Sequence, residues 1–391
     1  MSDDKVRQSL IENKALFIDA VRGRKPKRVP LLSHVWTWKV FDAGYKFSEC
    51  LFDYDKMANA MYQFHEKYDF DLYMDLGNRN PIKMLQNFDA EIYTVDDENG
   101  YLNFMDRDAM DAPQGLMDMA EKGMIRYTYE NILPNKYNVK DSADAIARLV
   151  AAAKEFKAFS DAFAKVQGTM TDKYGVPALC KGRYDVPAEV VFSAGLRGIK
   201  SFSMDMRRYP DLLEKMFAVM EPTTSETFYS ALNTFADDER MVFPVRLTCL
   251  AHTIMNAKQF ERFYWPALKH FGDELEKRDM CAFMFVEGSI NHVYDFYQEL
   301  SKDRIALMFE QDDPKLFKEK LPNVTPVGGF PLDLLSKGTP EQCVDKAKEM
   351  LDIMAYDGRW IYASNKMISY RNDARGENLK AVNDYLRKCV Y

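Results

Sequence analysis

Short apolar runs alternate with longer amphipathic stretches along nearly the whole chain. The clearest run, 281–286, is almost wholly apolar and ends abruptly in Glu287 and Gly288. An apolar run of about 4–8 residues bounded by a turn residue is typical of a strand buried on both faces. Runs of this kind predict eight strands, at 31–36, 70–75, 176–180, 241–247, 281–287, 305–309, 324–329 and 360–363.

The stretches between these runs carry apolar residues at helical spacing. They predict helices at 5–24, 48–68, 141–168, 187–198, 210–236, 258–278, 340–355 and 377–386. Strands and helices that alternate in this way favour parallel β/α connections. Because the chain lacks a Pro/Gly-rich linker, we predict that residues 1–391 form a single (β/α)8 TIM barrel. Neither G-x-G-x-x-G nor G-x-x-x-x-G-K-[ST] occurs, so a nucleotide-binding fold has no support.

The region 83–135 departs from this alternation. Its stretches 90–95 and 101–104 alternate polar and apolar residues, and the turn sequence at 97–100 separates them. This pattern predicts a β-hairpin. We therefore expect an inserted hairpin or lid segment near residues 83–135.

Composition narrows the class of protein. The 391 residues are 47% hydrophobic and 29% charged, with a net charge of −7. An acidic chain without a basic cluster is a poor candidate for binding nucleic acid or an anionic membrane. No run reaches the ~18 apolar residues of a membrane span, and the N-terminus lacks the apolar core of a signal peptide. We expect a cytoplasmic protein. Its six cysteines form no C-x-x-C pair, which argues against disulfides or a zinc ribbon.

Pockets of parallel α/β folds lie at the carboxyl ends of the strands, and Glu287 stands at such an end. A carboxylate there must be paired, neutralised or exposed to a pocket. Desolvation favours its protonated form, which suits a general acid. His252, after the strand at 241–247, is the next candidate. The structural alternatives are a helix cap for Glu287 and a core histidine for His252.

Other polar and aromatic side chains are predicted at the same end of the barrel. Lys366 joins the catalytic candidates, and the predicted substrate-binding residues are His34, Trp36, Asp75, Arg79, Arg183, Tyr184 and Tyr370. The aromatic rings would suit a flat or methylated substrate, although core packing explains them equally well. Each residue alone has a structural interpretation as plausible as the functional one.

Several segments carry a family resemblance. They are Phe-Glu-Arg-Phe-Tyr-Trp-Pro at 260–266, Val-Gly-Gly at 327–329 with 334–340, Gly-Arg-Trp-Ile-Tyr at 358–362, 377–381, and Phe-Ile-Asp-Ala-Val-Arg-Gly at 17–23 with 28–30. Together they resemble the uroporphyrinogen decarboxylase superfamily, which also contains cobalamin-dependent methyltransferases. The resemblance implies a (β/α)8 barrel with its site at the carboxyl-terminal mouth. It also implies that the protein pairs as a homodimer.

The decarboxylase pattern is broken after the first strand. Uroporphyrinogen decarboxylases have an arginine-rich segment there, which holds the many carboxylates of the substrate. This chain instead has His-Val-Trp-Thr-Trp-Lys at 34–39. One lysine and two tryptophans cannot hold a tetrapyrrole in the same way, so porphyrinogen decarboxylation is not expected.

The zinc pattern of the related methyltransferases is also broken. They carry His-x-Cys-Gly at the end of the strand that corresponds to 281–287 and a further cysteine on the last strand. Those positions correspond here to Phe285, Glu287 and Lys366. We therefore predict no standard zinc site, and an ion pair between Glu287 and Lys366 across the barrel mouth. A rebuilt site from Glu287, His252 and Cys249 stays open as an alternative.

The leading hypothesis is a methyltransferase of a corrinoid-dependent demethylation system. It would move a methyl group from a small methoxy, amine or thiol compound to a corrinoid carried by a partner protein. One alternative is a decarboxylase or lyase acting on a small carboxylic acid or a tetrapyrrole-like substrate, with Arg183 or Arg79 holding the carboxylate. Another is a non-catalytic protein that binds a corrinoid or tetrapyrrole.

Overall fold

A parallel five-stranded sheet forms the centre of the protein. The structure, a computed structural model, describes residues 3–74, 81–88, 93–104, 108–137, 139–193, 196–236 and 238–390. The strands are β3 (Ala178–Tyr184), β4 (Met241–Cys249), β5 (Ala282–Val286), β6 (Ile305–Phe309) and β7 (Thr325–Gly328). They pair in sequence order, and each pair is parallel.

Three shorter extended segments complete the ring through single parallel bridges. Tyr73 pairs with Ala178 of β3, and Leu72 pairs with Leu32 of the first segment. At the other edge, Val327 of β7 pairs with Ile361, whose neighbour Tyr362 pairs with Leu31. The pairing thus passes through eight segments and returns to the first. The predicted α/β barrel architecture is confirmed.

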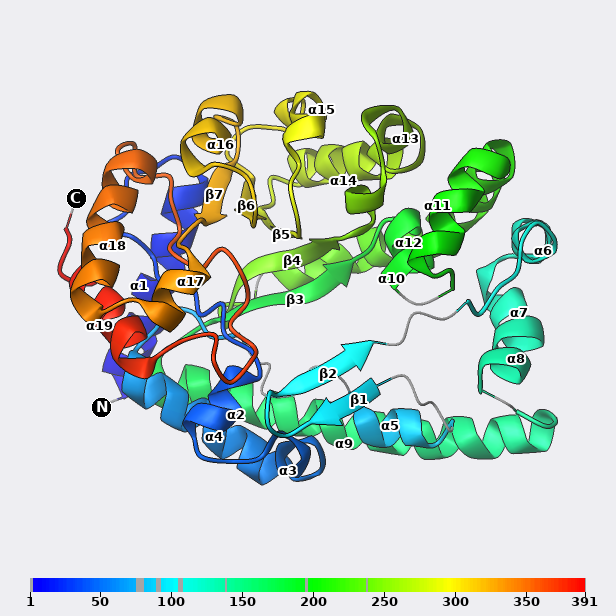
Figure 1. The fold of residues 1–391 in the computed structure, drawn as a ribbon, viewed down its shortest axis with the longest axis horizontal. Helices are drawn as coiled ribbons and strands as arrows, with labels where there is room; N and C mark the ends of the chain where they lie inside the picture. Colours follow the sequence, from blue (N-terminus) through cyan, green and yellow to red (C-terminus); the bar gives the residue numbers. More distant parts are fainter. Residues whose placement is uncertain are drawn as a thin grey trace.

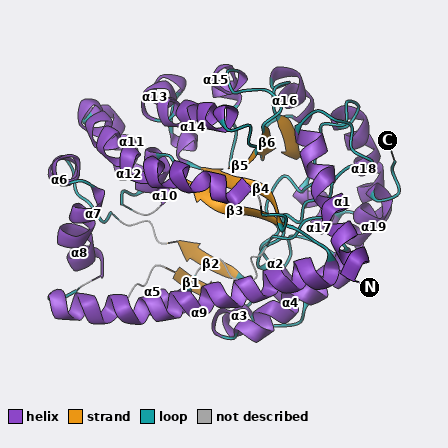
Figure 2. Ribbon diagram, turned by 180° about the vertical axis from the view of Figure 1, so that it is seen from behind, coloured by secondary structure: helices purple, strands orange, loops and turns teal. Residues whose placement is uncertain are grey.

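Helices surround the strands (Figure 1), and the same arrangement is seen from behind (Figure 2). Those that follow or precede the barrel strands are α1 (Asp3–Val21), α2 (Trp38–Asp42), α3 (Phe47–Phe52), α4 (Tyr54–Tyr68), α9 (Ser142–Tyr174), α10 (Pro187–Ser193), α11 (Ile199–Arg208), α12 (Pro210–Ala236), α13 (Ala257–Phe263), α14 (Trp265–Lys277), α15 (Tyr294–Gln298), α16 (Pro314–Lys320), α17 (Leu332–Lys337), α18 (Pro340–Met354) and α19 (Gly376–Leu386). Within the described residues, no helix is long and apolar enough to cross a membrane.

The strands are buried on both faces, as their apolar runs predict. Along β5, Phe283 and Phe285 belong to the cluster inside the barrel, whereas Met284 and Val286 pack in the cluster beneath the helices. Both clusters exclude water, so each face of the strand favours apolar residues. A charged side chain that points inward near a strand end therefore stands out.

The region between the second barrel segment and α9 contains the predicted insertion. It comprises α5 (Ile82–Gln86), β1 (Tyr93–Asp96), β2 (Tyr101–Phe104), α6 (Gln114–Lys122), α7 (Met124–Tyr127), a π-helical turn (Thr128–Ile132) and α8 (Leu133–Tyr137). β1 and β2 are antiparallel, so the predicted hairpin is confirmed. Its turn needs glycine at position 100, because φ is +81° and a Cβ would lie 2.1 Å from the Phe41 ring.

The hairpin turn is anchored to the loop that follows the last barrel segment. The Arg371 side chain donates hydrogen bonds to the carbonyl oxygens of Asp97, at 3.0 Å, and Glu98, at 2.6 Å. The Arg371 backbone N–H donates to the Asn99 carbonyl oxygen at 3.1 Å. The guanidinium also lies over the Phe41 ring, 4.3 Å from its centroid. This loop follows the carboxyl end of a barrel segment, so the hairpin turn lies on the mouth side of the barrel.

A buried carboxylate ties the two ends of the chain together. Asp71 is fully buried and accepts two hydrogen bonds of 2.6 Å from the Arg28 guanidinium. It also accepts one of 2.9 Å from the Leu31 backbone N–H, and it pairs with Arg387 at 3.0 Å. Arg387 directly follows α19. The first two barrel segments and the last helix therefore share one charge network.

Candidate active site

Charged side chains lie at the mouth, the end of the barrel formed by the carboxyl ends of its strands, and Arg246 lies deeper, three residues before the end of β4. Those at the mouth include Arg183 near the end of β3, Glu287 directly after β5, Glu310 directly after β6, and Lys366 after the last segment. Because the strands are parallel, these positions lie at one end of the barrel. Active sites of (β/α)8 proteins lie at this end.

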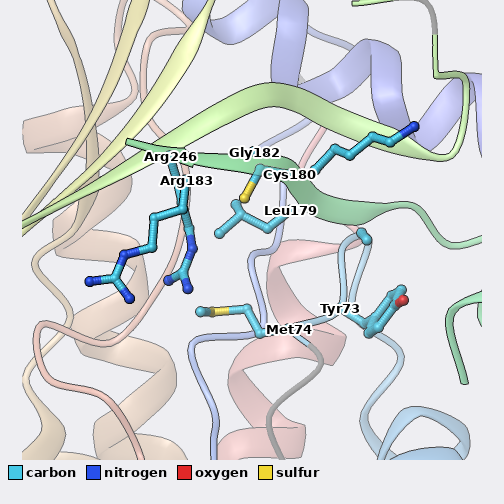
Figure 3. Close-up of a pocket in the computed structure, with 9 residues that line it drawn as sticks. Tyr73, Met74, Leu179, Cys180, Gly182, Arg183 and Arg246 are labelled. Atoms are coloured by element: carbon cyan, nitrogen blue, oxygen red, sulfur yellow. The ribbon is translucent and has the colours of Figure 1, made fainter. Parts of the chain in front are cut away.

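Arg183 and Arg246 are directly opposite each other in the β3–β4 pairing. Both border a cavity of about 180 Å³, which is further lined by Tyr73, Met74, Ala178, Leu179, Cys180, Lys181 and Gly182. Figure 3 shows both arginine side chains extending from the strands into this cavity, with Met74 on the facing side. The Arg183 Nε donates to Asp185 at 2.9 Å. The side chain of half-buried Arg246 has no hydrogen bond or ion pair among the described residues.

The opposite side of the mouth is built around Glu310. Its carboxylate accepts a hydrogen bond of 2.6 Å from the Gly288 backbone N–H and pairs with the Lys366 ammonium at 3.3 Å. The predicted ion pair between Glu287 and Lys366 is therefore wrong, because Lys366 pairs with Glu310. The strand order explains the difference, since β6 lies one strand closer than β5 to the segment that precedes Lys366.

His34 lies in the barrel interior, completely buried. Its Nδ1 is 3.2 Å from the Ser364 carbonyl oxygen and its ring meets Phe285 edge-on, with centroids 5.5 Å apart. A carbonyl only accepts hydrogen bonds, so Nδ1 carries the hydrogen. Burial lowers the pKa of His34 to about 3, which keeps the ring neutral. Its Nε2 therefore presents a lone pair, and it is buried without a partner among the described residues.

His252 is also buried and neutral. It lies in the 3-10 turn Ala251–Ile254 between β4 and α13. Burial lowers the pKa of His252 to about 4, and the Glu287 backbone carbonyl opposes the shift. That carbonyl is near the ring without forming a well-directed hydrogen bond, since neither ring nitrogen is satisfied within the described part of the chain. A neutral imidazole is a poor proton donor at pH 7, so His252 does not fit the role of general acid.

A buried carboxyl group supports the loop that carries His252. Glu189 of α10 accepts hydrogen bonds from the backbone N–H groups of Leu250, at 2.6 Å, and Ala251, at 2.8 Å. The Tyr264 hydroxyl donates to the same oxygen at 2.8 Å. Burial raises the pKa of Glu189 to about 7, although these hydrogen bonds oppose the shift. The group therefore ionises in the neutral range.

Tyr184 does not line the mouth. It is buried beneath the helices, with its ring stacked on Phe271 of α14 at 5.1 Å and near Phe228 and Tyr229 of α12. Successive side chains of a strand point to opposite faces, so an inward Arg183 requires an outward Tyr184. The sequence-based placement of both residues in one pocket was wrong for this reason.

The remaining predicted site residues have different outcomes. Trp36 packs beside the barrel interior, and Tyr370 is exposed on the loop before Arg371. Asp75 and Arg79 lie outside the described residues. In the segment that replaces the arginine-rich stretch, Trp38 and Lys39 are buried. Trp38 packs against Phe64 and Tyr68, and the buried Lys39 ammonium donates to the Met74 carbonyl oxygen.

Comparisons with known proteins identify the family. The sequence profile of uroporphyrinogen decarboxylase (URO-D) matches residues 124–388. The chain belongs to the URO-D family. Among solved structures, a methyltransferase from Methanosarcina mazei superposes on this URO-D protein with a TM-score of 0.62. The match covers 96% of this chain and 98% of the other at 16% sequence identity, which establishes a shared fold. A search of curated proteins found no match.

The residues of this URO-D family member do not fit a zinc ion at the position expected from its methyltransferase relatives. Phe285 has no ligating atom, and Lys366 pairs with Glu310. The alternative site from Glu287, His252 and Cys249 is not assembled, because Cys249 packs in the cluster beneath the helices, where burial raises its pKa. Among the described residues, no group of three or more His, Cys, Asp and Glu side chains is arranged to hold a metal.

Two mouth residues of this URO-D protein were missed in the sequence. Arg246 is the lone charge within the apolar run 241–247. Burying a charge is unfavourable unless an opposite charge or hydrogen bonds compensate for it, so this position indicates a functional role. Glu310 follows the run 305–309 directly, just as Glu287 follows 281–286. Both could have been found by applying to every strand the reasoning that selected Glu287.

Proposed function

We propose that this protein is the methyltransferase component of a corrinoid-dependent demethylation system. It passes a methyl group from a small methoxy, amine or thiol compound to a corrinoid carried by a partner protein. The observation that carries the proposal is the composition of the mouth. A URO-D family barrel here combines carboxylates with an apolar interior, while Trp38 and Lys39 of the replaced arginine segment are buried.

The proposed step is a displacement. The bond between the methyl carbon and its heteroatom breaks, and the electron pair stays on the heteroatom. The methyl acceptor, a corrinoid in the cobalt(I) state, supplies the electron pair of the new bond. The heteroatom takes up a proton, for which Glu287 at the end of β5 is the donor. Phe285, two residues before Glu287, points to the same face of the chain and packs edge-on against the buried His34 ring.

The test is methyl transfer to cob(I)alamin from a panel of methoxy-aromatics, methylamines and methyl thiols. The cobalt(I) and methylated cobalamins have distinct visible spectra, so the reaction is followed directly. We expect transfer from at least one class of donor. Failure of every class, with protein that remains folded, contradicts the proposal.

A second function is favoured by one specific observation, the pairing of Arg183 with Arg246. Two adjacent guanidinium groups suit a carboxylate, and a decarboxylase or lyase acting on a small carboxylic acid would use them to hold its substrate. Carbon dioxide release from a candidate acid, lost on changing either arginine, distinguishes this function from methyl transfer.

A further inference from the structure

We propose that Arg183 and Arg246 form a carboxylate-binding subsite, so that the substrate of this enzyme is an anionic compound with a carboxylate at the end remote from its methyl group. The statement about the methyl group rests on the proposed function. The statement about the carboxylate rests only on the cavity and its two arginines.

The first argument is the environment of Arg246. Its side chain borders a cavity inside the mouth, is half-buried, and has no acidic partner in the described part of the chain. Partial burial removes hydration that a cation needs, and an opposite charge is the usual compensation. The neighbouring cation on β3 adds electrostatic repulsion to this cost. An anionic ligand supplies the compensating charge.

The second argument is the way Arg183 is held. Its Nε donates to Asp185, which directs the rest of the guanidinium towards the cavity. Arg246 extends from the directly opposite position of the neighbouring strand, so both guanidinium groups border the same cavity (Figure 3). Two planar donor groups that face one cavity suit the two oxygens of a carboxylate, which guanidinium groups bind in a bidentate manner. A spherical anion, which has no pair of oxygens in a plane, would not need two planar donor groups.

The third argument is the distribution of charge around the mouth. The arginines are on β3 and β4, whereas Glu287 and Glu310 follow β5 and β6. A carboxylate is attracted to the first side, whereas the second side offers it no free positive charge because Lys366 is paired with Glu310, so an acid binds with its carboxylate at the arginines. Met74 and Leu179 provide apolar contact next to the arginines. The methyl-bearing end then points towards Glu287, the proposed proton donor.

The experiment compares matched pairs of methylated compounds that differ only in an acid or its neutral amide. The pairs are 4-methoxybenzoate with 4-methoxybenzamide, dimethylglycine with its amide, and methylthioacetate with its amide. Binding to the full chain is measured by calorimetry, without a methyl acceptor. The proteins are the wild type, Arg246→Gln, Arg246→Lys, Arg183→Gln and the control Arg240→Gln. Arg240 lies at the opposite end of β4, where it pairs with Asp238.

We expect at least one acid to bind while its amide does not. Loss of either mouth arginine should weaken acid binding by about 10- to 100-fold, the effect of one or two charge-assisted hydrogen bonds. Arg246→Lys should retain part of the affinity, and Arg240→Gln all of it. Thermal melting serves as the second measurement. Because Arg246 has no acidic partner among the described residues, Arg246→Gln should melt at the wild-type temperature or above.

Three results overturn the subsite: equal binding of acids and amides, acid binding that survives in both Arg183→Gln and Arg246→Gln, or no binding of any acid. Failure of methyl transfer is a separate outcome. If acids bind through the arginines but no methyl group reaches cob(I)alamin, the subsite stands and the proposed function fails. If only neutral donors transfer their methyl group, the proposed function stands and the subsite fails.

Discussion

The side chains at the mouth differ in the protons they carry at neutral pH. Burial lowers the pKa of His34 to about 3 and that of His252 to about 4, so both rings are neutral. Lys366 is already paired with Glu310. Neither ring can therefore supply a proton to a leaving group, and under the proposed function the donor is Glu287.

Glu287→Gln should therefore reduce methyl transfer by about 10²- to 10⁴-fold, the usual contribution of a general acid. Glutamine has nearly the same shape as glutamate but carries no acidic proton. Substrate binding and the melting temperature should therefore stay near the wild-type values. Single-turnover rates and calorimetry measure the two effects. Glu310→Gln is the control, because it removes a neighbouring carboxylate that has another role. A fully active Glu287→Gln enzyme would exclude Glu287 as the donor.

Glu189 gives a pH-dependent prediction at the same scale. Its pKa of about 7 lies above the ordinary value of 4.5, so the folded protein retains a proton that the unfolded chain loses. The resulting stability is complete below pH 4.5 and is lost as pH rises to about 7. Glu189→Gln cannot ionise, and it keeps an oxygen for the Leu250 and Ala251 N–H groups.

The free energies of unfolding of wild type and Glu189→Gln should be similar near pH 4.5. They should diverge above it, with the variant more stable at pH 8 by up to about 3 kcal/mol. Urea titrations across this pH range measure the difference, in which the contributions of the two buried histidines cancel. A difference that does not change with pH contradicts the raised pKa.

The sequence identified the mouth better than the roles of its residues. Glu287 and Arg183 could be placed there because each follows an apolar run, and Lys366 because the family resemblance aligned it with a ligand position at the last strand. The inward direction of Arg183 could not be separated from the outward direction of Tyr184, because the apolar run predicted a strand that ends at 180, whereas β3 continues to Tyr184. The partner of Lys366 depended on strand order in space, which local pattern does not contain.

At the scale of elements, the alternation of runs was informative because each barrel strand is buried on both faces. The predicted strand 305–309 and helix 210–236 coincide with β6 and α12. The predicted helix 258–278 is divided at Tyr264 into α13 and α14, since Pro266 in the first turn of α14 cannot continue the preceding helix. The first, second and last barrel segments pair through too few residues to be counted as regular strands.

The ring of Tyr184 joins β3 to α12 and α14 through its contacts with Phe228 and Phe271. Tyr184→Ala should destabilise the protein by about 3–5 kcal/mol, because a large buried ring is lost. Tyr184→Phe keeps the stacking on Phe271 and should leave activity unchanged. Chemical denaturation and methyl-transfer rates test the pair. A large loss of activity in Tyr184→Phe, at unchanged stability, would return this residue to the active site.

At the scale of the whole molecule, Asp71 holds the first two barrel segments to the end of α19. Asp71→Asn removes the buried charge from this network and leaves Arg28 without its ion-pair partner, while Arg387 keeps its pair with Asp69 at 3.1 Å. We expect a loss of about 3–5 kcal/mol in the free energy of unfolding. Asp279 is a matched control, because it also pairs with two arginines, Arg22 and Arg304, but its side chain is 76% exposed.

Asp279→Asn should cost less than about 1 kcal/mol, since exposed ion pairs are screened by water. Thermal and urea unfolding of both variants provide the measurement. Equal effects of the two substitutions would show that burial of the Asp71 network adds nothing. Neither variant should alter methyl transfer at temperatures where it stays folded.

The ring of bridges also has a consequence for how the protein is made. Closure joins His34 to Ser364, which lie 330 positions apart in the chain. A ribosome adding about 5–20 residues per second needs roughly 15–65 s to cover that distance. Throughout this time the apolar Leu31 and Leu32 lack the last barrel segment, with which they pair at Tyr362 in the complete protein. Nascent chains that lack the last strand should therefore be held by chaperones or degraded, and the barrel should be completed only as synthesis ends.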